Sequence, residues 1–174
     1  MKAVRTLAVL IAIGVVSPSC GEPPAAPVVP APAPQADLIG GLVGATGLLQ
    51  CSNLPYASTT RTIGSLGGSI SAGPHTLTIP PGALAQATTI TMTAPTGRGV
   101  NAVRFEPEGL RFDVSAALTM SYANCNLLGK LLPKRIAYTD ERLNILYYLL
   151  SLDNLLAKRV TGKLDHFSDY VIAW

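Results

Sequence analysis

Several residue types and motifs that would point to common functions are missing from this chain of 174 residues. Charged residues make up only 13% of it, and no basic block with interleaved aromatic residues occurs. Nucleic-acid binding therefore has no electrostatic support. The two histidines, His75 and His166, accompany no CxxC or HxxxH pair, so they do not make a typical zinc site. We expect no metal and no cofactor.

Two catalytic loops are also absent. Residues 64–68 lack the Gly-x-Ser-x-Gly order of a hydrolase elbow. Gly162-Lys163-Leu164 lacks the hydroxyl residue and the upstream glycine of a phosphate-binding loop. Aromatic residues are only 6% of the chain, with Trp174 as the lone tryptophan, which gives a carbohydrate-binding domain little support. The composition thus favours a protein that is not an enzyme.

The first residues carry the pattern of an export signal. Lys2 and Arg5 precede an apolar run over residues 7–16, followed by Ser17-Pro18-Ser19-Cys20. This pattern predicts a signal peptide over residues 1–19, and the apolar run is too short to span a bilayer. General signal peptidase and lipoprotein signal peptidase would both cut before Cys20. We favour the second, which leaves Cys20 acylated. An aspartate directly after the acylated cysteine retains bacterial lipoproteins at the inner membrane, and this chain has Gly21 at that position. We therefore expect the outer membrane if the source has two membranes.

The chain has three cysteines, Cys20, Cys51 and Cys125. An exported protein enters an oxidising compartment, where its cysteines are expected to form disulfides. If Cys51 pairs with Cys125, Cys20 remains for acylation; the alternative is that Cys51 and Cys125 are separate buried thiols. A bridge closing a loop of about 75 residues would stabilise the fold by roughly 4 kcal/mol in the chain-entropy treatment.

Two low-complexity segments follow the signal. Residues 20–36 hold prolines at 23, 24, 27, 30, 32 and 34 among alanine and valine, which predicts a lipid-anchored linker in polyproline II conformation. At ~3.1 Å per residue it would span roughly 50 Å. Residues 37–50 are rich in glycine and apolar residues, which indicates a connector, either a short helix or a strap across the domain. It is too short to cross a membrane.

Residues 51–174 show the pattern of an all-β domain. Apolar and polar side chains alternate with period two, and β-branched and aromatic residues are frequent. Turn residues such as Ala72-Gly73-Pro74 and Thr96-Gly97-Arg98-Gly99 separate the segments, which predicts an antiparallel sandwich or barrel. Residues 143–150 fit both a helical face and a strand, and we interpret them as a strand. The clearest alternation covers residues 76–79, 89–94, 103–106, 118–122 and 170–174.

Four short motifs stand out within residues 63–174. They are Gly67-Gly68, Leu77-Thr78-Ile79-Pro80-Pro81-Gly82-Ala83-Leu84, Phe105-Glu106-Pro107-Glu108-Gly109-Leu110-Arg111-Phe112 and His166-Phe167-Ser168. Together they resemble the ZU-five domain, the β-sandwich module shared by zonula occludens proteins, netrin receptors and ankyrins, with bacterial relatives. The resemblance implies an antiparallel β-sandwich of ZU-five type, and the whole layout resembles small exported bacterial lipoproteins.

The physical role of these motifs is structural. Pro80 and Pro81 cannot donate to a strand ladder and should end a strand, and Gly82 allows a positive φ. The Glu106–Gly109 turn should let Phe105 and Phe112 both enter the core. Animal relatives bind cytoskeletal and other proteins, but no residue here matches those binding surfaces.

His166-Phe167-Ser168 is the one motif with reactive potential. In some animal relatives this kind of tripeptide undergoes autoproteolysis between Phe and Ser. The reaction needs serine attack on the preceding carbonyl, a nearby base and a strained peptide bond. Period two would place His166 and Ser168 on one strand face. The alternative is that Phe167 belongs to the core while His166 and Ser168 form hydrogen bonds where a strand starts.

The sequence therefore predicts a non-catalytic, membrane-tethered, extracytoplasmic β-sandwich that acts as a protein-binding or structural module of the cell envelope. Its expected partners are the membrane, through the lipid on Cys20, and an envelope protein of unknown identity. The alternative of a different class is a self-cleaving domain that breaks between Phe167 and Ser168.

Overall fold

A computed structural model describes residues 47–127 and 132–174 of the chain. Within these residues the structure contains β-strands and turns and no helix. The strands are β1 (Ala57–Ile63), β2 (Gly68–Ala72), β3 (His75–Ile79), β4 (Thr88–Ala94), β5 (Ala102–Glu106), β6 (Arg111–Ser121), β7 (Arg135–Thr139), β8 (Ile145–Tyr148), β9 (Ser151–Asn154), β10 (Arg159–His166) and β11 (Asp169–Ala173).

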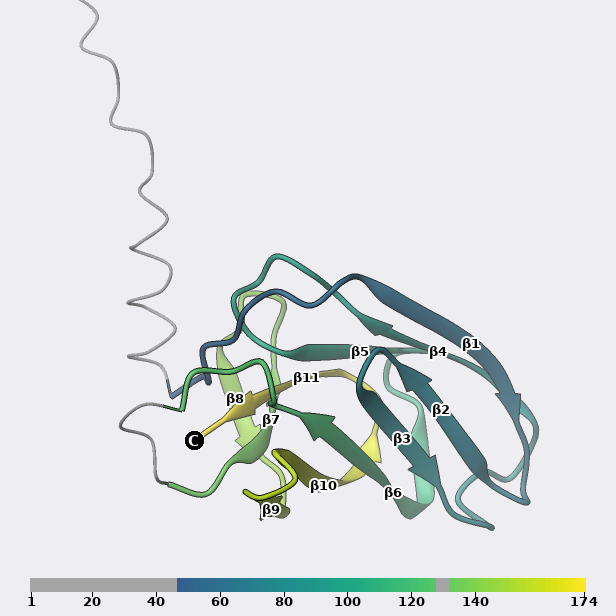
Figure 1. Cartoon of the computed structure of the whole chain (residues 1–174). Helices are drawn as coiled ribbons and strands as arrows, with labels where there is room; N and C mark the ends of the chain where they lie inside the picture. The colour runs from purple at the N-terminus through teal and green to yellow at the C-terminus, as the bar shows by residue number, and fades with distance from the viewer. Residues whose placement is uncertain (1–46, 128–131) are drawn as a thin grey trace, which may run out of the picture. The chain divides into compact units, whose positions relative to one another are not determined.

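The strands form two antiparallel sheets that pack face to face, which confirms the predicted β-sandwich (Figure 1). The six-stranded sheet has the order β1-β4-β5-β11-β7-β8, and the five-stranded sheet has the order β2-β3-β6-β10-β9. Strands β1 and β2 lie at one pair of sheet edges, and β8 and β9 at the other. The chain passes from one sheet to the other at six links, which are β1–β2, β3–β4, β5–β6, β6–β7, β8–β9 and β10–β11.

Alternation of side chains builds the core between the sheets. In β4, Ile90 and Met92 are buried in the main core, while Thr89, Thr91 and Thr93 alternate with them and face outward. The outer face of the six-stranded sheet carries a second, smaller apolar cluster. It consists of Leu48, Val100, Ala102, Ala137, Val171 and Ala173, with Leu143 and Ile145 packed against it.

The predicted strands and turns are largely found. Strand β3 ends at Ile79, directly before Pro80-Pro81, and Gly82 has φ of 78°. The ambiguous stretch 143–150 contains strand β8, as predicted. Phe105 is fully buried and Phe112 packs against the same core, so the turn at Glu106–Gly109 does bring both rings inward.

The packed part of the domain begins before residue 51. Leu48 and Leu49 are both buried, and the N–H of Leu49 donates to the carbonyl oxygen of Ile172 at 3.0 Å. Leu48 forms an isolated antiparallel bridge with Ala173. The last residues of the predicted connector therefore form an extended strap across β11, and the rest of the connector, residues 37–46, lies outside the described residues.

Candidate functional site

The chain changes sheets at Phe167 and Ser168, because β10 belongs to the five-stranded sheet and β11 to the six-stranded sheet. Phe167 anchors this corner. Its ring is fully buried, stacked on Phe105 at 4.7 Å and edge-on to Phe112 at 5.1 Å between ring centroids. Aromatic contacts of this kind contribute about 0.5–1.5 kcal/mol each beyond the area they bury. The predicted core role of Phe167 is therefore observed.

The backbone of Phe167 is paired with the Glu106–Gly109 turn and the residue after it. Its N–H donates to the carbonyl oxygen of Leu110 at 2.8 Å, and its own carbonyl oxygen accepts from the N–H of Gly109 at 3.1 Å. The Nδ1 atom of His166 lies 3.3 Å from the same carbonyl oxygen. Two nitrogen atoms thus face the oxygen of the peptide bond that the motif would cleave.

Ser168 is not joined to His166 by a hydrogen bond. The ring of His166 faces the Phe167 carbonyl oxygen and packs edge-on to Tyr138 at 5.4 Å between centroids. The hydroxyl of Ser168 makes no hydrogen bond with another described residue, and Ser168 lines a groove on the outer face of the six-stranded sheet. Strand β10 ends at His166, so the period-two placement of the two side chains on one strand does not extend to Ser168.

Tyr170 holds the other side of the corner. Its hydroxyl donates a 2.6 Å hydrogen bond to the carbonyl oxygen of His166. Burial is the main cause that raises the pKa of Tyr170, with smaller contributions from Tyr138 and Asp165. The phenol therefore stays protonated at neutral pH and remains a donor. His166 through Tyr170 is consequently a well-bonded corner, and none of these residues has a positive φ.

The groove beside Ser168 has a volume of about 750 Å³ and is divided from a smaller cavity of about 240 Å³ by an ion pair. Arg104 on β5 donates from Nε and Nη2 to the two carboxylate oxygens of Asp169 on β11, both at 2.8 Å. This two-point pairing with Asp169 raises the pKa of Arg104. Arg104, Asp169 and Thr139 line both cavities.

Carboxylates dominate the rim of the larger groove. Glu106, Glu108, Asp140 and Glu141 line it together with the paired Asp169, against one arginine. Beneath them, Thr139 is buried and its hydroxyl oxygen has no hydrogen-bond partner among the described residues. The groove is thus an acidic depression with an unsatisfied hydroxyl under it. Within the described residues, no group of three or more His, Cys, Asp or Glu side chains is arranged to hold a metal ion.

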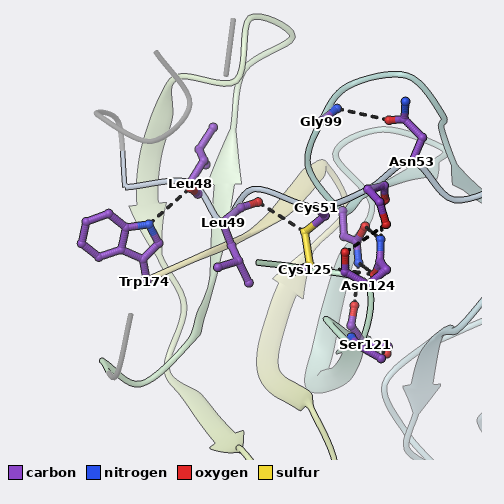
Figure 2. The surroundings of a disulfide bond; sticks show 12 residues. Leu48, Leu49, Cys51, Asn53, Gly99, Ser121, Asn124, Cys125 and Trp174 are labelled. Atoms are coloured by element: carbon purple, nitrogen blue, oxygen red, sulfur yellow. Dashed lines mark hydrogen bonds between the residues drawn. A yellow bond between two sulfur atoms is a disulfide. The ribbon is translucent and has the colours of Figure 1, made fainter. Parts of the chain in front are cut away.

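The predicted disulfide is present between Cys51 and Cys125 (Figure 2). The two sulfur atoms are bonded to each other, so the alternative of two separate thiols is excluded. Cys51 precedes β1 and Cys125 follows β6, as expected, and the bridge joins residues separated by 74 positions. The N–H of Cys51 also donates to the carbonyl oxygen of Gly99 at 2.8 Å.

A pair of asparagines reinforces the bridge. Asn101 is buried, and its Nδ2 donates to Asn124 Oδ1 at 2.7 Å, while Asn124 Nδ2 donates back to Asn101 Oδ1 at 3.0 Å. Asn124 Nδ2 also donates to the carbonyl oxygen of Ser52 at 2.5 Å, and Asn101 Nδ2 to that of Ser121 at 2.8 Å (Figure 2). Disulfide and amides together fasten the strap to the body of the domain.

Cys20, the predicted lipidation site, lies outside the described residues. Sequence reasoning found the disulfide and the Phe167 corner but missed the Arg104–Asp169 pair, Thr139 and the asparagine pair. The alternation around Val103 and Phe105 did place Arg104 on the outer face. Nothing local indicated its partner, 65 positions away.

Comparison with protein-family models and with curated proteins finds no match for this chain. The resemblance to the ZU-five domain therefore stays a prediction. No described residue belongs to a helix long and apolar enough to cross a membrane.

Proposed function

We propose that this chain is a lipid-anchored, extracytoplasmic β-sandwich of ZU-five type that acts as a non-enzymatic binding or structural module of the cell envelope. The observation that carries the proposal is the Cys51–Cys125 disulfide at the point where the N-terminal segment joins the domain. Structural disulfides persist in oxidising compartments and are rare in the cytosol. Pairing of Cys51 with Cys125 also leaves Cys20 as the remaining cysteine, which supports its use for acylation.

Acylation is tested by expressing the chain with its own N-terminus in a bacterium and partitioning the product with detergent. We expect the mature protein in the detergent phase and Cys20→Ala in the aqueous phase. Recovery of the unaltered chain from the aqueous phase would disprove the anchor. Mass spectrometry of the N-terminal peptide identifies the acyl groups on Cys20 directly.

The acidic groove supports the binding role. It is lined by four carboxylates besides the Arg104–Asp169 pair, which suits a partner segment carrying lysine or arginine. Envelope extracts cross-linked to the unaltered chain and to Glu106→Lys/Glu108→Lys test this role. The matched control is Asp113→Lys, an exposed carboxylate on β6 outside the groove.

A partner retained by the unaltered chain and by Asp113→Lys, but lost by Glu106→Lys/Glu108→Lys, is the expected result. A partner that binds all three chains equally would place binding elsewhere on the domain. A chain that gives no cross-linked partner under any condition would favour a purely structural module.

A second candidate function is self-cleavage between Phe167 and Ser168, and one contact set favours it. The Phe167 carbonyl oxygen faces both Gly109 N–H and His166 Nδ1, an arrangement that would stabilise negative charge on that oxygen. In the reaction, Ser168 Oγ would form an ester with the Phe167 carbonyl carbon while the Phe167–Ser168 C–N bond breaks and the nitrogen becomes an amine. Water would then hydrolyse the ester.

Denaturing intact-mass spectrometry separates the two candidates. A chain that contains residues 168–174 in full is expected from the binding module. A species lacking these seven residues, and absent in Ser168→Ala, would establish self-cleavage.

A further inference from the structure

Seven of the eleven large apolar side chains that are most exposed on the described surface lie within residues 146–156. Leu150 and Leu152 are 72% and 79% exposed, and Leu156 is 99% exposed. Single exposed leucines are ordinary, but a contiguous set marks an interaction surface. We call four of these positions the leucine strip: Leu150, Leu152, Leu155 and Leu156. Leu146 lines the acidic groove and is not part of the strip.

The strip is held firmly by the fold. Leu156 lies in the β9–β10 turn, where Lys158 N–H donates to the Leu155 carbonyl oxygen at 3.3 Å and Ala157 N–H donates to Asn154 Oδ1 at 3.0 Å. The Lys158 carbonyl oxygen accepts from the N–H of Tyr122 at 2.9 Å, which ties the turn to β6. The bonded turn therefore presents the Leu156 side chain to solvent.

Positive charge borders the strip. Leu152 pairs with Thr161 on β10, so Arg159 and Lys163, two positions on either side of Thr161, face outward beside it. Lys158 adds a third cation at the turn. None of these three cations forms an ion pair within the part of the chain that the structure describes.

The one acid among residues 146–164 is turned away from this surface. Asp153 accepts a 2.6 Å hydrogen bond from the Tyr122 hydroxyl and a 2.8 Å bond from the Lys134 N–H. The alternation of β9 places Leu152 on the outer face and Asp153 on the other. The outer surface thus combines exposed leucines with three cations. Asp165, two positions after Lys163 on the same face of β10, accepts a 2.6 Å hydrogen bond from the Ser115 hydroxyl.

The N-terminal segment joins the domain on the same side. A Cβ added to Gly47 would stand 3.4 Å from the hydroxyl oxygen of Tyr148 on β8, and two residues link β8 to β9. The described part of the chain therefore begins beside β8, close to the link that carries Leu150.

From these observations we propose that the leucine strip is a membrane-contact surface, with the Leu155–Leu156 turn entering the interface of a bilayer that contains anionic phospholipid. Leucine side chains would bury apolar area among the acyl chains, and Lys158, Arg159 and Lys163 would lie close to anionic headgroups. The choice of a bilayer over another occupant rests on this charge border and on the proposed lipid anchor.

The test places a fluorescent bimane label on the full chain at Leu156→Cys, in a Cys20→Ala background so that only one thiol reacts. The matched control is Leu66→Cys in the same background, because Leu66 is 88% exposed in the β1–β2 turn, outside the strip. Vesicles contain phosphatidylethanolamine and phosphatidylglycerol with a nitroxide-labelled lipid. We expect blue-shifted emission and several-fold stronger quenching at position 156 than at position 66.

Charge removal supplies an independent readout. Each of Lys158→Gln and Arg159→Gln should lower the vesicle partition coefficient about fivefold, and purely zwitterionic vesicles should abolish that difference. Equal quenching at positions 156 and 66 would overturn the inference. A blue shift at position 156 that grows with protein concentration in the absence of vesicles would also overturn it, because a second copy would then cover the strip.

Flotation of the chain with Cys20 intact separates this inference from the proposed anchor. Flotation without quenching at position 156 upholds the anchor and overturns the membrane contact. Quenching at position 156 despite Cys20→Ala, together with a non-acylated Cys20 in the unaltered chain, upholds the contact and overturns the anchor. A chain that neither floats nor shows quenching overturns both.

Discussion

Gly67 faces the carbonyl oxygen of Ile79 with no room for a side chain between them. Gly67 has φ of 72°, and a Cβ built on it would collide with that oxygen and with the backbone of Pro80. This approach closes the β2–β3 hairpin against the β1–β2 turn, where the N–H of Gly82 donates to the Ser65 carbonyl oxygen at 2.8 Å. Gly67 is thus required both for its backbone angle and for its lack of a Cβ.

Gly67→Ala should lower the free energy of unfolding by about 3 kcal/mol or more, because backbone strain of about 1–3 kcal/mol adds to a clash with main-chain atoms. Gly82→Ala is the matched control. Gly82 has φ of 78°, but nothing lies within 4 Å of its added Cβ. Gly82→Ala should therefore lower the free energy of unfolding only by the backbone strain, which is about 1–2 kcal/mol. Urea unfolding followed by tryptophan fluorescence measures both. Equal losses in the two variants would contradict the steric argument.

Removal of the disulfide should cost roughly 4 kcal/mol of unfolding free energy, given 74 positions between Cys51 and Cys125. The double variant Cys51→Ala/Cys125→Ala and the unaltered chain under reducing agent should unfold at similar urea concentrations, both well below the oxidised chain. Non-reducing peptide mapping should recover the linked pair. An oxidised chain no more stable than the reduced one would mean that the hydrogen bonds around Asn101 and Asn124 hold the strap without the bridge.

Stability should fall on acidification because of His75. This ring is buried at the start of β3, Nδ1 accepts from the N–H of Ser121 at 3.2 Å, and burial lowers the pKa of His75 to about 4. The unfolded chain takes up the proton near pH 6.5, and the folded chain does so only near pH 4. The free energy of unfolding should therefore be insensitive to His75 above pH 6.5 and fall by about 3 kcal/mol between pH 6.5 and 4.

His75→Asn is the control for this pH dependence, since its Oδ1 can accept from the same N–H and does not titrate. The difference in unfolding free energy between the two chains should change with pH only below about 6.5. Parallel pH profiles for the two chains would assign the acid sensitivity to other groups.

The chain should remain intact at Phe167–Ser168. The His166 ring contacts the carbonyl oxygen and leaves the Ser168 hydroxyl without a base among the described residues, and no residue of the corner has a positive φ. Purified protein held for several days at neutral pH should keep its full mass under denaturing conditions. Ser168→Ala provides the reference mass for an uncleavable chain. Loss of residues 168–174 in the unaltered chain alone would reverse this prediction.

The elements that sequence reasoning found share one property, which is that their local pattern matches their final environment. Strands β3 and β4 alternate between core and surface, so period two was sufficient to predict them. Strand β1 is exposed over most of its length and carries serine, threonine and arginine, so its sequence shows no alternation that predicts a strand. It is a strand because it pairs with β4. In β10, Gly162 occupies an inward position against Ile136 and interrupts the apolar alternation.

The site was less predictable than the fold. The disulfide followed from the cysteine count and the expected compartment. The Arg104–Asp169 pair depends on the adjacency of β5 and β11, where these two residues are directly opposite each other. That adjacency is set by the order of strands in the sheet, which short-range alternation does not determine. Of the leucine strip, only Leu150 falls in the ambiguous segment 143–150, and the local pattern did not indicate that Leu152, Leu155 and Leu156 are exposed.

The Cys51–Cys125 bridge also determines how the domain responds to mechanical force. Tension applied between the N-terminal segment and Trp174 first peels the strap from β11 and then reaches Cys51. From there it crosses a covalent bond to Cys125, so residues 52–124, which contain β1 to β6, lie outside the loaded path. More than half of the strands would therefore be spared direct stretching, and β7 to β11 would set the unfolding force.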